Sequence, residues 1–149
     1  MEAEDTVINN APAERGGGTV RNKREEIEKA VRASISDPRF SVERLAEAVG
    51  LSVSYLREIA ESEYGTGPRW LIETIRIEEA LKMLADGGGS VFSISRKVGY
   101  SNVRSFRKAF EKRVNMSPSE CRDYLHKEKD EDTLFATLVK RLDGGEKFR

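Results

Sequence analysis

Residues 90–118, SVFSISRKVGYSNVRSFRKAFEKRVNMSP, repeat the plan of an earlier stretch, SVERLAEAVGLSVSYLREIAESEYGTGP, at residues 41–68. Each stretch opens on Ser-Val, reaches a Val-Gly pair, continues with an apolar residue and a serine, and ends at a proline. An internal repeat of this kind indicates two copies of one supersecondary unit. We therefore expect two similar subdomains in this chain.

The apolar spacing within each copy predicts two short helices joined by a tight turn. Ser41 and Ser90 are the predicted N-caps, and Gly50 and Gly99 stand where a left-handed residue ends the first helix. The predicted core positions are Val42, Leu45, Ala46, Val49, Leu56 and Ile59 in the first copy and Val91, Ile94, Val98, Val103, Phe106 and Phe110 in the second. Such a pair of helices forms a helix-turn-helix, whose second helix can enter the major groove of DNA.

A third segment, RWLIETIRIEEALKMLAD at residues 69–86, connects the two copies. It predicts one long helix that ends at the glycines of residues 87–89, with Trp70 anchored in the core. Its length of about 27 Å, at 1.5 Å per residue, suits a spacer that holds two recognition helices roughly one DNA turn apart. The apolar face of this helix consists of Leu71, Ile75, Ile77, Leu81 and Leu84.

Positive charge is concentrated in one part of the chain. The 149 residues carry 26 basic and 26 acidic side chains, yet residues 87–125 alone hold eight basic and three acidic ones. A local basic patch is a better footprint of polyanion binding than the net charge of the whole chain. Within residues 99–118 a single acid, Glu111, stands among five cations, which are Arg104, Arg107, Lys108, Lys112 and Arg113.

A helical projection of residues 102–113 separates the core side of this segment from its charged side. Val103, Phe106 and Phe110 share one narrow arc, and Arg104 and Lys108 point almost the opposite way. Arginine and asparagine suit base edges, whereas lysines further along the helix suit phosphates. The predicted DNA-contacting residues are Asn102, Arg104, Ser105 and Arg107, together with Lys97, Lys108 and Lys112 for phosphates. The competing interpretation is an ordinary solvated basic face.

The two ends of the chain have different characters. Residues 1–22 contain a glycine triplet and no periodic pattern, which predicts a disordered arm or linker. A first helix follows, with Ile27, Val31 and Ile35 on its buried face, and Pro38 breaks it. In the tail, residues 126–149, an amphipathic helix is expected over residues 130–145. That helix either packs back on the domain or serves docking or dimerisation.

Composition and side-chain chemistry argue against several classes of protein. A single cysteine rules out an internal disulfide and fits a reducing compartment, and no apolar run approaches the length of a membrane span, so we expect a cytoplasmic protein. His126 has only Cys121 as a possible companion ligand, whereas a zinc site needs three or four. Cys121 is expected to be a part-buried packing residue rather than a redox sensor. We predict no metal, no cofactor and no enzymatic activity.

The composite of these motifs resembles the DNA-binding domain of AraC/XylS-type transcription regulators, from about Phe40 to Tyr124. The residues that carry the resemblance are Arg76-Ile77 with Ala80, Gly99-Tyr100-Ser101, Phe106 with Phe110, and Ser117-Pro118. The resemblance implies an all-α fold of about seven helices, with two recognition helices in adjacent major-groove segments of double-stranded DNA. It also implies a bacterial regulator of transcription initiation with RNA polymerase as a partner. A ligand-sensing domain does not fit in the first 40 residues.

The first recognition helix departs from that family pattern. Glu58 and Glu61 stand where basic residues are usual, and Ala60 replaces an aromatic residue. Acids at these positions would repel phosphates, so the second unit is expected to supply most of the DNA affinity. The residues left for the first unit are Ser52, Ser54, Tyr55 and Arg57. Asn115, where the family has glycine, still tolerates a left-handed turn. The alternative function is a protein-interaction module whose acidic first unit contacts RNA polymerase or another regulator.

Overall fold

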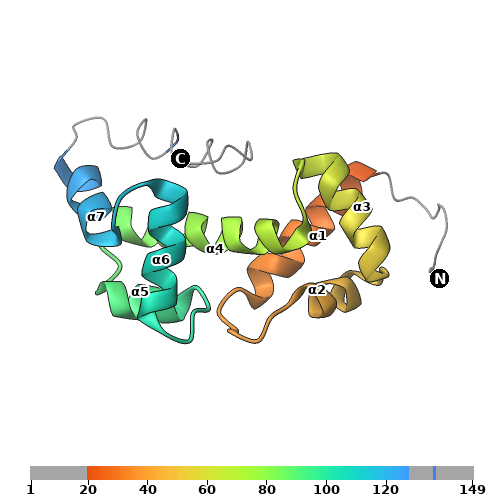
Figure 1. Cartoon of the computed structure of the whole chain (residues 1–149), viewed down its shortest axis with the longest axis horizontal. Coiled ribbons are helices and arrows are strands. Elements are labelled where there is room, and N and C mark those ends of the chain that lie inside the picture. Colours follow the sequence, from red (N-terminus) through yellow and green to blue (C-terminus); the bar gives the residue numbers. More distant parts are fainter. Residues whose placement is uncertain (1–19, 128–135, 137–149) are drawn as a thin grey trace. The chain divides into compact units, whose positions relative to one another are not determined.

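The computed structural model describes residues 20–127 and residue 136, and the regular secondary structure within them is all helical (Figure 1). The described residues form α1 (Val20–Ser34), α2 (Val42–Val49), α3 (Val53–Tyr64), α4 (Pro68–Ala85), α5 (Val91–Lys97), α6 (Val103–Val114) and α7 (Pro118–Lys127). The all-α prediction and its seven helices are confirmed. Helix α1 begins at Val20, slightly inside the predicted arm. The helix expected over residues 130–145 lies outside the described residues, Ala136 excepted.

The chain folds into two compact units that are not simply consecutive in sequence. The first unit contains α1, α2, α3 and the start of α4, up to Ile72. The second unit contains the rest of α4 and α5 to α7, together with Ile35–Arg39. That five-residue segment, which we call the strap, connects α1 to α2 in sequence but belongs to the second unit. Among the described residues no helix is long and apolar enough to span a membrane.

The first unit is built from α1 packed on α2 and α3, as Figure 1 shows. Its fully buried side chains include Ile27, Val31, Leu45, Leu56 and Ala60. At the far end of α3, the Tyr64 hydroxyl donates to Glu28 at 2.6 Å, which ties α3 to α1. Val42, Val49 and Trp70 are only half-buried, because the small first unit leaves part of their surface in water.

The core of the second unit gathers side chains from α4, α5, α6 and α7. Phe106 and Phe110 are fully buried, and Tyr100 packs on Phe106 with ring centroids 5.5 Å apart. Cys121 is also fully buried, and burial raises the pKa of its thiol to about 12. Cys121 is therefore a packing residue as predicted, but it is fully buried and not part-buried. Val103, expected in the core, is only partly buried at its edge.

Capping residues explain where helices of the two helix-turn-helix units begin and end. Ser41 and Ser90 accept hydrogen bonds from the N–H groups of Arg44 and Ser93, at 3.2 and 3.0 Å, as N-cap serines do. Gly50 ends α2 in the left-handed conformation, with φ 70°. Asn115 ends α6 in the same conformation, with φ 69°, so the substitution of asparagine for glycine preserves the turn.

Candidate nucleic-acid interface

Helix α6 presents a basic face to solvent. Phe106, Phe110 and Val114 occupy its buried side, so the charged residues between them point outwards. Every second-unit residue predicted to contact DNA is exposed: Lys97, Asn102, Arg104, Ser105, Arg107, Lys108 and Lys112. Glu111 is the exposed acid on the same helix. The arrangement provides four exposed cations on one helix of twelve residues.

Asn102 stabilises the start of α6, apart from any contact with DNA. It is the N-cap of α6, and its side-chain oxygen accepts a hydrogen bond from the Ser105 N–H at 2.8 Å. A bidentate contact with adenine needs both the oxygen and the amide group of an asparagine. The cap uses one of the two lone pairs of that oxygen, so a contact with DNA would use the amide donor pair and the second lone pair.

Arg113 is a correction to the predicted basic face. It is 1% exposed, and its guanidinium donates to the Glu73 carboxylate at 2.8 Å and to the Thr74 hydroxyl. Burial lowers the pKa of Arg113, an effect that the Glu73 carboxylate opposes. Arg113 follows Phe106 by seven residues, which on a helix is almost the same direction, so the sequence did carry a signal of burial. This cation belongs to the core and is not available to a polyanion.

Arg96 is a basic residue that the repeat and the helical projection of α6 do not identify. It lies near the end of α5, donates a hydrogen bond to the Ser101 carbonyl, and has its guanidinium 5.5 Å from the Phe92 ring centroid. Phe92 is itself 58% exposed, so the two side chains lie together at the surface. Arg96 is thereby held next to the residue that caps α6. Only its inclusion in the charge count of residues 87–125 pointed to it.

The equivalent helix of the first unit, α3, presents a different surface. Ser52 is its N-cap and accepts a hydrogen bond from the Tyr55 N–H at 3.1 Å. All four first-unit residues predicted to contact DNA are exposed: Ser52, Ser54, Tyr55 and Arg57. Glu58 and Glu61 are exposed on the same helix, about one and two turns after Ser54. Ala60 is fully buried, so the replacement of an aromatic residue by alanine changes the core of the first unit and not its surface.

The one histidine has a structural contact. A ring nitrogen of His126 lies 3.1 Å from the Leu84 carbonyl and 3.3 Å from the Ala85 carbonyl, at the C-terminal end of α4. It therefore satisfies a helix end, where backbone carbonyls have no partner in their own helix. Within residues 20–127, no three side chains among His, Cys, Asp and Glu come together in a way that could hold a metal ion.

Comparisons with known proteins agree with this geometry. The family described as "Helix-turn-helix domain" matches residues 45–124, which run from α2 to α7. The chain is 36% identical over 75 residues to the raffinose operon transcriptional regulatory protein RafR of Pediococcus pentosaceus. That match covers 50% of this chain and 27% of the relative, so the chain spans about a quarter of the relative's length.

Solved structures show the same fold. The C-terminal domain of the two-component response regulator yesN from Fusobacterium nucleatum is 26% identical, with a TM-score of 0.62 over 68% of this chain and 98% of that one. The DNA-binding domain of the global transcriptional factor AdpA, solved in complex with a target DNA, is 21% identical, with a TM-score of 0.60 over 68% of this chain and 93% of that one. The second likeness concerns the fold alone.

Proposed function

The chain belongs to the AraC/XylS type of helix-turn-helix DNA-binding domain found in transcription regulators, and from this premise we propose that its second unit supplies most of the DNA affinity. In this proposal α6 enters the major groove of double-stranded DNA, with its exposed basic face towards the nucleic acid. The observation that carries it is the clean separation on α6 between buried Phe106 and Phe110 and exposed Arg104 and Lys108.

Individual roles follow from side-chain chemistry. Arg104 and Arg107 can form bidentate hydrogen bonds with guanine edges, and Asn102 can donate from its amide group. The residues proposed to hold phosphates are Lys97, Lys108 and Lys112, with Ser105 as a further hydrogen-bonding group. We add Arg96 to the phosphate contacts, because its guanidinium is already fixed beside the start of α6. A preorganised side chain loses less conformational freedom on binding.

The first unit makes a weaker contribution in this proposal. The leading end of α3 offers Ser54, Tyr55 and Arg57 to an adjacent major-groove segment, while Glu58 and Glu61 repel phosphates. In this proposal the eighteen-residue α4, about 27 Å long, is the spacer between the two recognition helices. The complex of AdpA with its target DNA supports the idea that this fold approaches a duplex directly.

The direct test is binding to random-sequence duplex DNA, followed by fluorescence anisotropy across a salt series. The four proposed phosphate contacts correspond to a slope of about −3.6 in log affinity against log salt. The double variant Arg104→Glu/Lys108→Glu should weaken binding by about a hundredfold or more, because each reversal replaces attraction with repulsion. Both residues are exposed, so the fold should survive the change.

A matched control separates a specific interface from a general effect of charge. Lys82→Glu/Lys127→Glu makes the same change in net charge at two exposed positions outside α6, and it should leave most of the affinity intact. Equal losses in the two double variants would mean that only the overall charge matters. Salt-insensitive binding that neither variant changes would show that the basic face is ordinary surface.

A second candidate function rests on the exposed acids of α3. Glu58 and Glu61 occupy the positions where a recognition helix would carry cations, so the first unit could instead contact a protein. The partner proposed for that contact is RNA polymerase or another regulator. In that case reversing both acids to lysine would leave the affinity for DNA unchanged and weaken the contact with polymerase.

A further inference from the structure

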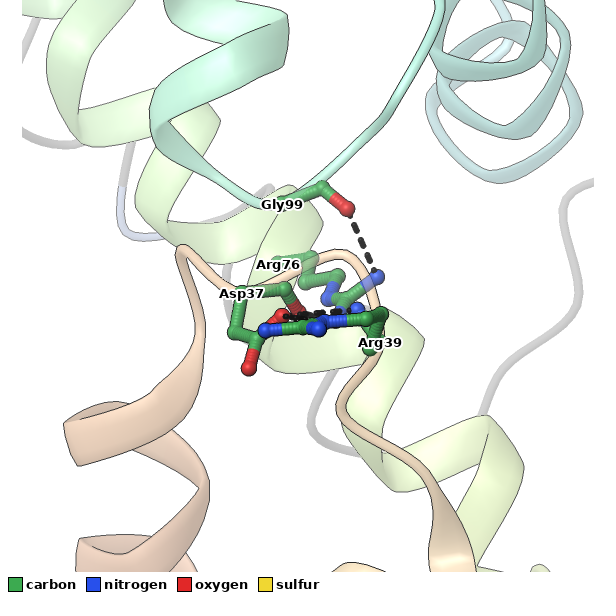
Figure 2. Close-up of polar contacts among 4 residues, drawn as sticks. All are labelled: Asp37, Arg39, Arg76 and Gly99. Atoms are coloured by element: carbon green, nitrogen blue, oxygen red, sulfur yellow. Dashed lines mark hydrogen bonds and ion pairs between the residues drawn. The ribbon is translucent and has the colours of Figure 1, made fainter.

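Arg76 on α4 contacts two backbone segments that are far apart in sequence. Its side chain is 9% exposed, and its two terminal nitrogens donate to the Gly99 carbonyl at 3.2 Å and to the Asp37 carbonyl at 3.0 Å. Figure 2 shows the guanidinium between the strap and the turn of the second helix-turn-helix. All three segments belong to the second unit. A guanidinium suits this task because its donors lie in a fixed planar fork.

The strap is shaped so that a carbonyl faces Arg76. The Asp37 carboxylate accepts hydrogen bonds from the Arg39 N–H at 2.9 Å and from the Arg39 guanidinium at 3.5 Å (Figure 2). Pro38, between them, fixes its own backbone angle and has no N–H to satisfy. These contacts close the strap on itself and leave the Asp37 carbonyl for Arg76.

The turn is pressed closely against both partners. Gly99 has a φ of 95°, and a Cβ added to it would lie 2.1 Å from the Ile35 carbonyl oxygen and 3.0 Å from the Arg76 guanidinium carbon. The next residue, Tyr100, has its ring centroid 5.7 Å from that guanidinium and packs on Phe106 of α6. A continuous set of contacts therefore connects Arg76 to the recognition helix.

Burying a charged guanidinium costs more free energy than burying an apolar side chain of the same volume. Burial lowers the pKa of Arg76, an effect that nearby Tyr100, Asp37 and Glu73 oppose, and the group nevertheless stays protonated near neutral pH. An apolar side chain of similar volume often packs in such a place at no loss of stability. What it cannot do is bond two carbonyls in fixed directions. The use of arginine here points to geometry and not to packing alone.

We propose that Arg76 is the positioning residue of the second helix-turn-helix: it fixes the turn at residues 99–101 against the strap and so sets the place of α6, without touching DNA itself. Its consequence for DNA binding rests on the function proposed above. The strap, which precedes the first helix-turn-helix in sequence, thereby serves the second one.

The test compares Arg76→Met with Lys82→Met in the full chain. Lys82 lies on the same helix and is exposed, so its replacement makes the same change in charge without disturbing the turn. Two quantities are measured: the affinity for duplex DNA across a salt series, and hydrogen exchange of the Tyr100 N–H, which donates to the Ser95 carbonyl at 2.9 Å. Arg76→Met should bind about tenfold more weakly with an unchanged salt slope, and its Tyr100 amide should exchange faster.

Three results would overturn the proposal. The first is the same affinity and the same Tyr100 exchange in both variants. The second is a salt slope lower by about one for Arg76→Met, which would indicate a phosphate contact. The third is an effect on exchange without any effect on affinity. If Arg76→Met fails to fold, Arg76→Lys carries the test, because it keeps the charge but lacks the planar fork.

A failure of the proposed function gives a different pattern. If the wild-type chain binds no DNA, the function proposed above is wrong, and the exchange measurement alone then decides whether Arg76 positions the turn. Faster exchange at Tyr100 in Arg76→Met, with Lys82→Met unchanged, would support the positioning role. Equal exchange in the two variants would refute it.

Discussion

The two helix-turn-helix units have the same plan but differ at equivalent positions of their turns. Gly50 and Gly99 both have positive φ angles, of 70° and 95°. A side chain added at Gly50 would meet nothing within 4 Å, whereas one added at Gly99 would collide with the strap. The first turn therefore needs glycine only for its backbone conformation, and the second also needs it for lack of space. One motif in the sequence thus serves two different physical requirements.

The two recognition helices, α3 and α6, also share a plan and differ at equivalent exposed positions. Ser52 and Asn102 cap α3 and α6 at equivalent positions, so the helices begin alike. Further along, Glu58 of α3 corresponds to Lys108 of α6, and both are exposed. Since the buried residues keep the fold, the exposed ones are free to diverge. The same buried plan therefore carries an acidic exposed position in α3 and a basic one in α6.

The largest expected effect distinguishes the two turns. Gly99→Ala should lower the free energy of unfolding by about 3 kcal/mol, from left-handed strain together with overlap against the Ile35 carbonyl. Gly50→Ala should cost about 1 kcal/mol, from strain alone. Urea unfolding followed by circular dichroism measures both. Equal losses would mean that the strap yields easily and that the turns are equivalent after all.

The next largest expected effect is on the affinity for DNA, and it compares residues of the two recognition helices. Arg104→Ala should weaken binding to a selected operator by about 1–3 kcal/mol and relax the base preference at one position. Lys108→Ala should weaken binding to all sequences alike. Arg57→Ala, in α3, should have a smaller effect than either, because its neighbours are acidic. Anisotropy with operator and random duplexes separates these cases, and identical profiles for Arg104→Ala and Lys108→Ala would contradict the assigned roles.

A smaller effect tests whether α3 faces DNA. Glu58→Lys/Glu61→Lys should raise the affinity for duplex DNA by about tenfold and steepen the salt slope by one to two units, roughly. The physical reason is the loss of two repulsive charges and the gain of two attractive ones. The measurement is the same salt series. An unchanged slope would place α3 away from the nucleic acid and favour the protein-contact function.

The smallest expected effect concerns the Cys121 thiol, in the core of the second unit. The folded-state pKa of Cys121, about 12, lies above its ordinary value of 9.0. A raised pKa means that the contribution to stability is full below pH 9 and is lost as the pH rises towards 12. Relative to Cys121→Ala, the wild-type chain should lose about 1 kcal/mol by pH 10. Parallel stability curves for the two proteins would show that the thiol is not protected by burial.

Much of the fold and of the basic face follows from the sequence, because both depend on local rules. The repeat, the capping serines and the spacing of Phe106 and Phe110 identify the helices and their buried sides. Arg104 and Lys108 were placed on the solvent side by helical geometry alone, and the structure confirms their exposure. The division of cations into base and phosphate contacts stays a prediction.

Other features depend on which helix packs against which, and helical spacing carries no such information. Helical spacing places Arg113 on the buried side of α6, but only the fold shows that its partner is Glu73, forty residues away in sequence. The strap is part of the second unit because Arg76 and Gly99 meet it there.

The sequence by itself determined two helix-turn-helix units, their caps and the side of α6 that carries charge, since these are properties of short segments with a fixed period. Only the tertiary structure decided which groups meet the buried guanidinium groups of Arg76 and Arg113. A buried guanidinium is stable only where carbonyls or carboxylates from other segments meet its donors, and that meeting is a property of the assembled fold.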